Sequence, residues 1–192
     1  EIRRCHTVLK LDGIKLHHNA SQVYLTVPAH TARIKEIFRY ASGNNIPILL
    51  HFDNGHRKFG QRDVQILADS VLAGLAPLTL QVAHFGTSGG FTPRTMEVIG
   101  HFLELYRQQH PATKHNILFD ISAVCLDKDS EGVKKLAETE FNTLAGYCRK
   151  LGFERIVFGS DYPLYGSREY LALLKEKLKL TEKEMAELLR DK

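Results

Sequence analysis

The stretch "RIVFGSDYPLYG", residues 155–166, decides the fold class. Its apolar run at 156–158 is typical of a buried strand, and Asp161 follows this run after only a glycine and a serine. Pro163 delays the next helix, so a simple helix cap does not account for Asp161. A buried strand that ends on a carboxylate predicts that a cation, a metal ion or a proton meets the carboxylate there.

The strand signal at 155–161 is the last of five in the chain. Apolar strands that alternate with helices are typical of a parallel sheet covered by helices. Two architectures fit this alternation: an open doubly wound sheet and a closed (β/α)8 barrel. We expect strands over 12–18, 46–51, 78–86, 116–123 and 155–161, and helices over 31–45, 62–75, 95–110, 131–152, 167–180 and 181–192.

Length and composition indicate one domain, residues 1–192, with a sizeable core. Hydrophobic residues make up 43% and charged residues 25%, which is typical of a globular protein. The net charge of +4 comes without a basic stripe, and no apolar run reaches membrane length, so neither nucleic acid nor a membrane is expected as a partner. Three widely spaced cysteines predict a reducing compartment, the cytoplasm.

Ionisable side chains stand at the ends of the predicted strands. His17, His51, His84 and Asp161 each lie at or near the carboxyl end of a different strand. Those ends converge at the active-site face of parallel α/β folds. Imidazole and carboxylate are the ligands that a catalytic divalent metal such as zinc prefers, so His51, His84 and Asp161 are the predicted metal ligands. For Asp120, in the fourth strand, we expect a hydrogen-bonded structural role.

Several of these segments resemble the amidohydrolase superfamily, in its branch of small metal-dependent hydrolases and decarboxylases. "IPILLH", "VAHFG" and "IVFGSDYP" look like strands five, six and eight of that family's barrel, and "DGIKLHH" looks like its fourth strand. The resemblance implies that His51 binds metal and that His84 binds metal or polarises the substrate. It also implies that Asp161 binds metal and moves the proton of the attacking water.

The chain departs from the family in two places. It contains no His-x-His pair of the kind that the family's first strand carries, and Leu164 stands where a histidine usually follows "SDYP". The predicted strands recur about every 36 residues, so eight units would need about 290 residues, in line with such barrels. We therefore expect a partial barrel of five parallel strands, equivalent to strands four to eight. The other strands belong to a longer polypeptide or, less in keeping with the family, to another chain.

Other candidate residues surround the predicted metal site. Lys15, His17, Thr87, Ser88 and Arg57 lie on strand ends or on the loops after them, and we assign them to substrate binding. Five further histidines are expected at the surface, at positions 6, 30, 101, 110 and 115.

The predicted function is hydrolysis of an amide or ester bond of a small molecule by a metal-activated water, with Asp161 and His84 as catalytic residues. Non-oxidative decarboxylation of a small aromatic or enol acid is the first alternative. A non-catalytic barrel fragment is the second, and a phosphate-binding protein, resting on "GTSGG" at 86–90, is the third. The oligomeric state stays open, with a homo-oligomer as one possibility.

Overall fold

The computed structural model of the chain describes residues 1–130 and 132–192. One sheet of five parallel strands forms its centre, in the order β1-β2-β3-β4-β5. Each strand lies beside the next one in the sequence, which is the connectivity of a (β/α)8 barrel rather than of a doubly wound sheet. The predicted partial barrel is confirmed. The strands are β1 (Ile14–His17), β2 (Ile48–His51), β3 (Thr79–Val82), β4 (Asn116–Asp120) and β5 (Ile156–Val157).

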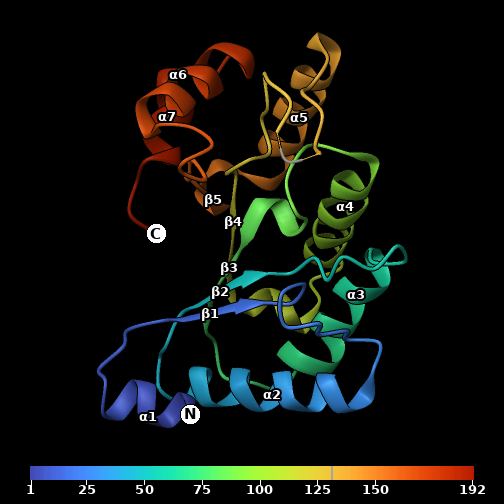
Figure 1. Cartoon of the computed structure of the whole chain (residues 1–192), viewed down its shortest axis with the longest axis vertical. Coiled ribbons are helices and arrows are strands. Elements are labelled where there is room, and N and C mark those ends of the chain that lie inside the picture. The colour runs from blue at the N-terminus through green and yellow to red at the C-terminus, as the bar shows by residue number, and fades with distance from the viewer. Residues whose placement is uncertain (131) are drawn as a thin grey trace.

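Helices connect the strands and cover the sheet (Figure 1). α2, α3, α4 and α5 each link two neighbouring strands, whereas α6 and α7 follow β5 at the C-terminal end. A short helix, α1, precedes β1 and was not expected from the sequence. The helices are α1 (Ile2–Thr7), α2 (Pro28–Gly43), α3 (Gln61–Ile66), α4 (Pro93–Arg107), α5 (Glu138–Leu151), α6 (Ser167–Lys177) and α7 (Glu182–Leu188).

Two predicted helices differ from the observed ones. The helix expected over 62–75 is α-helical only to Ile66 and continues as a π-helix over Leu67–Leu72. The helix expected over 131–152 begins at Glu138, because Glu140 accepts a hydrogen bond from the backbone N–H of Ala137 and fixes the first turn there. Residue 131 itself lies outside the described residues.

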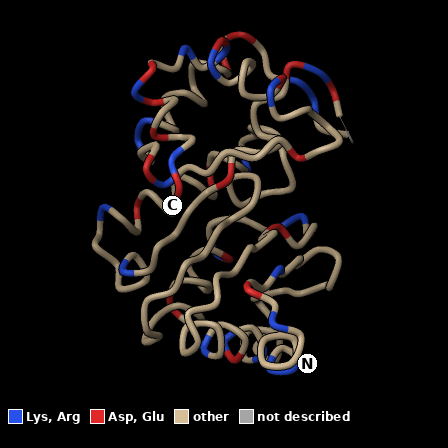
Figure 2. The backbone as a smooth tube through the Cα atoms, turned by 90° about the vertical axis from the view of Figure 1, so that its left-hand side faces the viewer, with Lys and Arg blue, Asp and Glu red and all other residues tan. Residues whose placement is uncertain are grey.

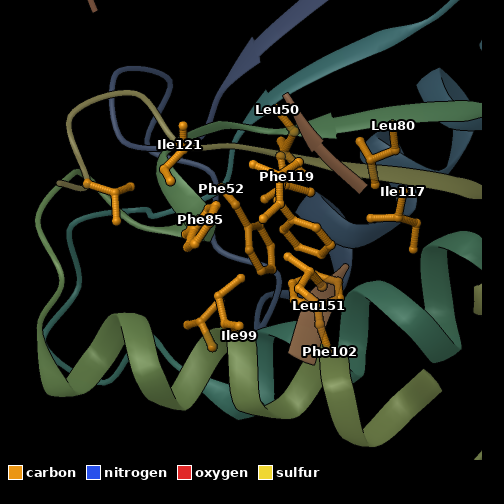
Figure 3. Packing of buried hydrophobic residues seen from close by; sticks show 14 of the residues in the cluster. Leu50, Phe52, Leu80, Phe85, Ile99, Phe102, Ile117, Phe119, Ile121 and Leu151 are labelled. Carbon is orange, nitrogen blue, oxygen red and sulfur yellow. The ribbon is translucent and has the colours of Figure 1, made fainter. Parts of the chain in front are cut away.

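The hydrophobic core lies between the sheet and α4 (Figure 3). Phe102 of α4 meets Phe119 of β4 edge to face, with ring centroids 4.9 Å apart. Leu50, Phe52 and Phe119 are fully buried in this layer. These residues alternate along their strands with side chains on the opposite face, so one face of each strand is fixed against the helices.

The opposite face of the sheet carries polar side chains among apolar ones. Lys15 pairs in register with Leu49, Leu49 with Gln81 and Gln81 with Leu118, so these four residues form one row. Lys15, Leu49 and Gln81 line a shallow hollow of about 360 Å³. One step further along β1 and β2, His17 is the register partner of His51. The concave face of the partial barrel therefore leads to the histidines at the strand ends.

Charge is spread over the surface. Figure 2 shows Lys, Arg, Asp and Glu interspersed along the outer helices and loops, while the segments of the sheet are mostly uncharged. Within 1–130 and 132–192, no helix has both the length and the apolar character needed to cross a membrane. The three cysteines are free thiols, and two of them are buried.

One histidine expected at the surface is buried. His115 is only 4% exposed, and its Nδ1 accepts a hydrogen bond from the backbone N–H of Leu78. Its Nε2 donates to the carbonyl oxygen of Leu72 at 3.0 Å. The surface prediction for His115 is therefore wrong, because both ring nitrogens bond to the backbone just before β3 and replace the water they would lose.

Candidate functional site

His17 and His51 stand side by side at the ends of β1 and β2. Their rings stack with centroids 3.9 Å apart and an interplanar angle of 14°. This contact follows from the parallel register, which places residues 17 and 51 directly opposite each other on one face. The third predicted histidine joins the group, because the ring centroid of His84 lies 5.3 Å from that of His51. Three strands therefore bring three imidazoles together.

His51 is kept neutral by its surroundings. Burial lowers its pKa to about 3, and His17, His84 and Lys15 act in the same direction through their charges. Its Nε2 lies 3.3 Å from the hydroxyl oxygen of Ser88, a residue predicted to bind substrate. A histidine must be neutral to coordinate a metal, so His51 is suited to that role across the physiological pH range.

The backbone at His84 takes an uncommon conformation. His84 and Phe85 have φ values of 50° and 52°, and Gly86 follows with a φ of 86°. Left-handed backbone is costly for residues other than glycine, so the surrounding structure must hold it in place. Asp120 contributes by accepting a hydrogen bond from the backbone N–H of His84 at 3.2 Å.

Asp120 is the centre of the network that holds His84. Besides the His84 N–H, its carboxylate accepts hydrogen bonds from Gln81 Nε2 at 3.2 Å and from the backbone N–H of Ser122 at 3.0 Å. The hydroxyl of Ser122 also donates to it. The expected structural role of Asp120 is confirmed. The hydrogen bond between Asp120 and His84 was not predicted, because a single sequence does not show which residues of different strands are in contact.

The hydrogen bonds of the ring nitrogens define the tautomers of two histidines. Nδ1 of His84 lies 2.8 Å from the carbonyl oxygen of Ser122, which can only accept, so Nδ1 carries the proton and Nε2 keeps a free lone pair. His17 has the opposite arrangement. Its Nδ1 accepts from the backbone N–H of Ala20 at 3.2 Å, so the neutral ring has its proton on Nε2. His84 therefore offers an electron pair, and His17 offers a hydrogen-bond donor.

Asp161 forms no hydrogen bond with His17, His51 or His84. It is exposed after β5 with a φ of 53°, and its carbonyl oxygen accepts from the backbone N–H of Leu164. Its carboxylate makes no hydrogen bond with another described residue. The placement of Asp161 beside the histidines stays a prediction.

The other residues that we predicted to bind substrate differ in their exposure to solvent and in their hydrogen bonds. Lys15 is exposed, and its charge reaches His17 and His51. Thr87 is buried, and its hydroxyl bonds to the His84 carbonyl oxygen and to Thr95. Arg57 is exposed on the loop after β2, where its carbonyl oxygen accepts from Arg94. Among the described candidates, Ser88 places its hydroxyl 3.3 Å from a ring nitrogen of His51, while His17 stacks on the same ring.

The donor chemistry of His51 and His84 fits a divalent cation, because imidazole nitrogen is a preferred ligand of zinc and similar ions. Taking 1–130 and 132–192 together, no three His, Cys, Asp or Glu side chains lie close enough to hold a metal ion. The metal-ligand role of His51 and His84 stays a prediction, and two imidazoles alone would leave a zinc site without its remaining ligands.

Backbone groups of the glycine-rich loop after β3 already form hydrogen bonds within the protein. The backbone N–H of Gly90 donates to the carbonyl oxygen of Ala123 at 2.6 Å, and the hydroxyl of Thr95 donates to the carbonyl oxygen of Gly90. α4 begins only at Pro93, a residue without an N–H. These features do not favour the phosphate-binding alternative.

Sequence and structure comparisons agree with this architecture. The model of the amidohydrolase family matches residues 1–191, so the chain belongs to that family. None of the curated proteins matches the chain. A 2,6-dihydroxybenzoate decarboxylase from Rhizobium is similar in structure, with a TM-score of 0.59 at 12% identity over 98% of this chain and 63% of its own.

A second similar structure is an amidohydrolase from Burkholderia multivorans with bound zinc. Its TM-score is 0.57 at 16% identity, over 93% of this chain and 61% of its own length. At these identities the likeness shows the fold. The coverages of 63% and 61% mean that the chain spans less than two thirds of the length of either structure.

Proposed function

We propose that this chain carries part of the active site of a metal-dependent hydrolase that cleaves an amide or ester bond of a small molecule. The single observation that carries the proposal is the pair of histidines, His51 and His84, with ring centroids 5.3 Å apart at the ends of adjacent strands. Both would bind a divalent ion, most naturally zinc. The remaining ligands would come from Asp161 and from a part of the barrel that this chain does not include.

A bound divalent ion supplies hydroxide at neutral pH by lowering the pKa of water from about 15.7 towards 7. Asp161 would accept the proton of that water and return it to the leaving group, first as general base and then as general acid. His17 would donate a hydrogen bond from Nε2 to the substrate carbonyl. His84 is better suited to binding the ion than to stabilising an oxyanion, because its Nδ1–H is already donated to the carbonyl oxygen of Ser122 and only Nε2 is left to face an ion.

Decarboxylation of an aromatic acid is the second candidate reaction. The structural similarity to the 2,6-dihydroxybenzoate decarboxylase supports it. In that reaction Asp161 would protonate the ring carbon that loses carbon dioxide, while Lys15 and His17 would hold the acid. The two reactions share the same metal ligands and differ in their product.

The test is a zinc titration of the metal-free complete protein. We expect His51→Gln and His84→Gln each to weaken zinc binding by more than about 100-fold, because each removes one nitrogen ligand. His101→Gln on α4, which bonds to Gln65, is the matched control and should bind zinc like the wild type. Unchanged zinc affinity in both site variants would refute the ligand assignment. Product analysis with amides, esters and aromatic acids then separates hydrolysis from release of carbon dioxide.

A further inference from the structure

A second cavity lies beside the candidate site, between the loop after β1 and the loop after β2. Its volume of about 480 Å³ is in the range of small-molecule sites. Tyr24 and Val27 line it from the first loop, and Phe59 lines it from the second. None of the histidines at 17, 51 and 84 contributes to its wall. The cavity therefore has a lining of its own, in which His56 is the histidine.

Two buried polar side chains form part of its lining. Asn54 is 5% exposed and Asp63 is 3% exposed. Oδ1 of Asn54 accepts from the backbone N–H of His56, while the Asn54 amide group donates to no described residue. Among the described residues, only Nε2 of His18 is both fully enclosed and without a partner. The Asn54 amide therefore reaches open space, and the cavity that it lines supplies that space.

Asp63 also has capacity for a further bond. Its Oδ2 accepts from the backbone N–H of Gly60 at 3.2 Å, and a carboxylate can accept about four hydrogen bonds. Burial raises the pKa of Asp63, which shows that its charge is poorly solvated. A ligand that donates an N–H or O–H to this carboxylate would relieve that cost.

The rest of the lining adds positive charge and apolar surface. Lys58 and Arg62 line the cavity, and neither forms an ion pair within the described part of the chain. Tyr24, Val27 and Phe59 supply two aromatic rings and one aliphatic side chain. Aromatic rings favour planar ligands, and unpaired cations favour an anionic group.

We propose that this cavity binds a small planar acid that also carries an amide group. The amide N–H groups donate to Asp63, and the amide oxygen accepts from Asn54. The ring packs against Tyr24 and Phe59. The acidic group pairs with Arg62, and Lys58 adds a second positive charge to the same lining.

The experiment uses NMR titration of the complete protein with para-carbamoylbenzoate as the probe. Benzoate lacks the amide, and benzamide lacks the acid, so these two are matched probes. We expect para-carbamoylbenzoate to shift the side-chain amide signal of Asn54 and the backbone signal of Phe59. It should bind about tenfold more tightly than either fragment, since each polar group contributes about one charge-assisted hydrogen bond.

Variants inside and outside the cavity test whether the probe binds there. Arg62→Gln, at an exposed side chain, and Asp63→Asn should each weaken the probe about tenfold, whereas Arg168→Gln on α6 should leave its affinity unchanged. Three outcomes would overturn the proposal: no shift at Asn54 up to about 10 mM probe, equal affinity for all three compounds, or shifts confined to His17, His51 and His84. The result does not depend on the metal or on the reaction proposed above.

Discussion

Nδ1 of His84 donates a hydrogen bond to the carbonyl oxygen of Ser122, 38 residues further along the chain, at 2.8 Å. This bond determines which ring nitrogen of His84 is free. Because Asp120 also accepts from the backbone N–H of His84, the histidine is held both at its ring and at its backbone. A histidine fixed in this way presents one electron pair in one direction, as a metal ligand requires.

Asp120→Asn should weaken both the fold and the site. The variant replaces a carboxylate that accepts from Gln81, His84 and Ser122 with an amide that presents its own donors to them. We expect the free energy of unfolding to fall by about 2–3 kcal/mol and zinc affinity to fall by about 10- to 100-fold. Denaturant unfolding and zinc titration measure the two effects. Asp129→Asn, at an exposed carboxylate whose one bond, from the Lys135 N–H, an amide oxygen can still accept, is the control. Wild-type zinc affinity in Asp120→Asn would show that the network does not position His84.

Asp161→Asn should separate stability from activity. Asp161 is exposed, and its carboxylate bonds to no described residue, so the free energy of unfolding should change by less than about 0.5 kcal/mol. Turnover of the complete protein should largely disappear, because an amide cannot accept the proton of water. Asp191→Asn, an exposed carboxylate near the C-terminus, serves as the comparison. A turnover within about tenfold of wild type, or about 1.4 kcal/mol of barrier, would speak against Asp161 as the proton carrier.

A pair of variants at His17 tests its assigned hydrogen bond. His17→Phe keeps a ring against His51 but loses the Nε2 donor, whereas His17→Gln keeps an N–H donor and loses the stack. If the donor binds substrate, His17→Phe should raise KM by about tenfold and His17→Gln should raise it less. Steady-state kinetics of the complete protein provides the measurement. The reverse order would indicate that the stacking with His51 matters and that the donor does not.

Acid should destabilise the fold through His18. This side chain is 1% exposed, and burial lowers its pKa to about 4. The unfolded chain binds a proton near pH 6.5, and the folded chain binds it only near pH 4, so stability falls as the pH drops through this window. The loss from His18 approaches about 3 kcal/mol at the lower end. Denaturant unfolding between pH 7 and about pH 4 measures this loss of unfolding free energy.

His18→Leu removes the titrating group and the unpartnered Nε2. Its stability at pH 7 should stay within about 1 kcal/mol of wild type, and its pH dependence should be shallower. His6→Gln, at a half-buried histidine beside Tyr40, controls for the loss of any histidine. An unchanged pH profile in His18→Leu would mean that other groups cause the acid sensitivity.

The alternation of strands and helices predicted a helix-covered parallel sheet, and the family resemblance then favoured a barrel over a doubly wound sheet. Apolar runs such as residues 48–50 predicted buried strands, and His51 belonged to a strand end because the register of a parallel sheet aligns those ends. His17 and His51 meet for that reason. The family membership agrees with the segments that suggested it.

Other features depend on contacts that no single segment encodes. His115 is buried because two backbone groups from a different part of the chain satisfy its ring, and nothing in its neighbours along the sequence indicates this. The role of Asp120 depends likewise on residues from β3. The start of α5 was misplaced because the helical spacing of apolar residues continues into a loop, whereas the Glu140 bond to Ala137 sets the first turn.

The left-handed turn at His84 has a consequence for motion. A methyl group on Gly86 would come within 2.7 Å of Val98 in α4, so this turn is packed directly against the core helix. The N–H of His84 is bonded to a carboxylate that is itself buried. Local opening of the turn would therefore require part of the core to separate, and hydrogen exchange at the His84 amide should be as slow as in the central strands. On this expectation the histidine opens together with the core, and the loops around it supply the movement that admits a substrate.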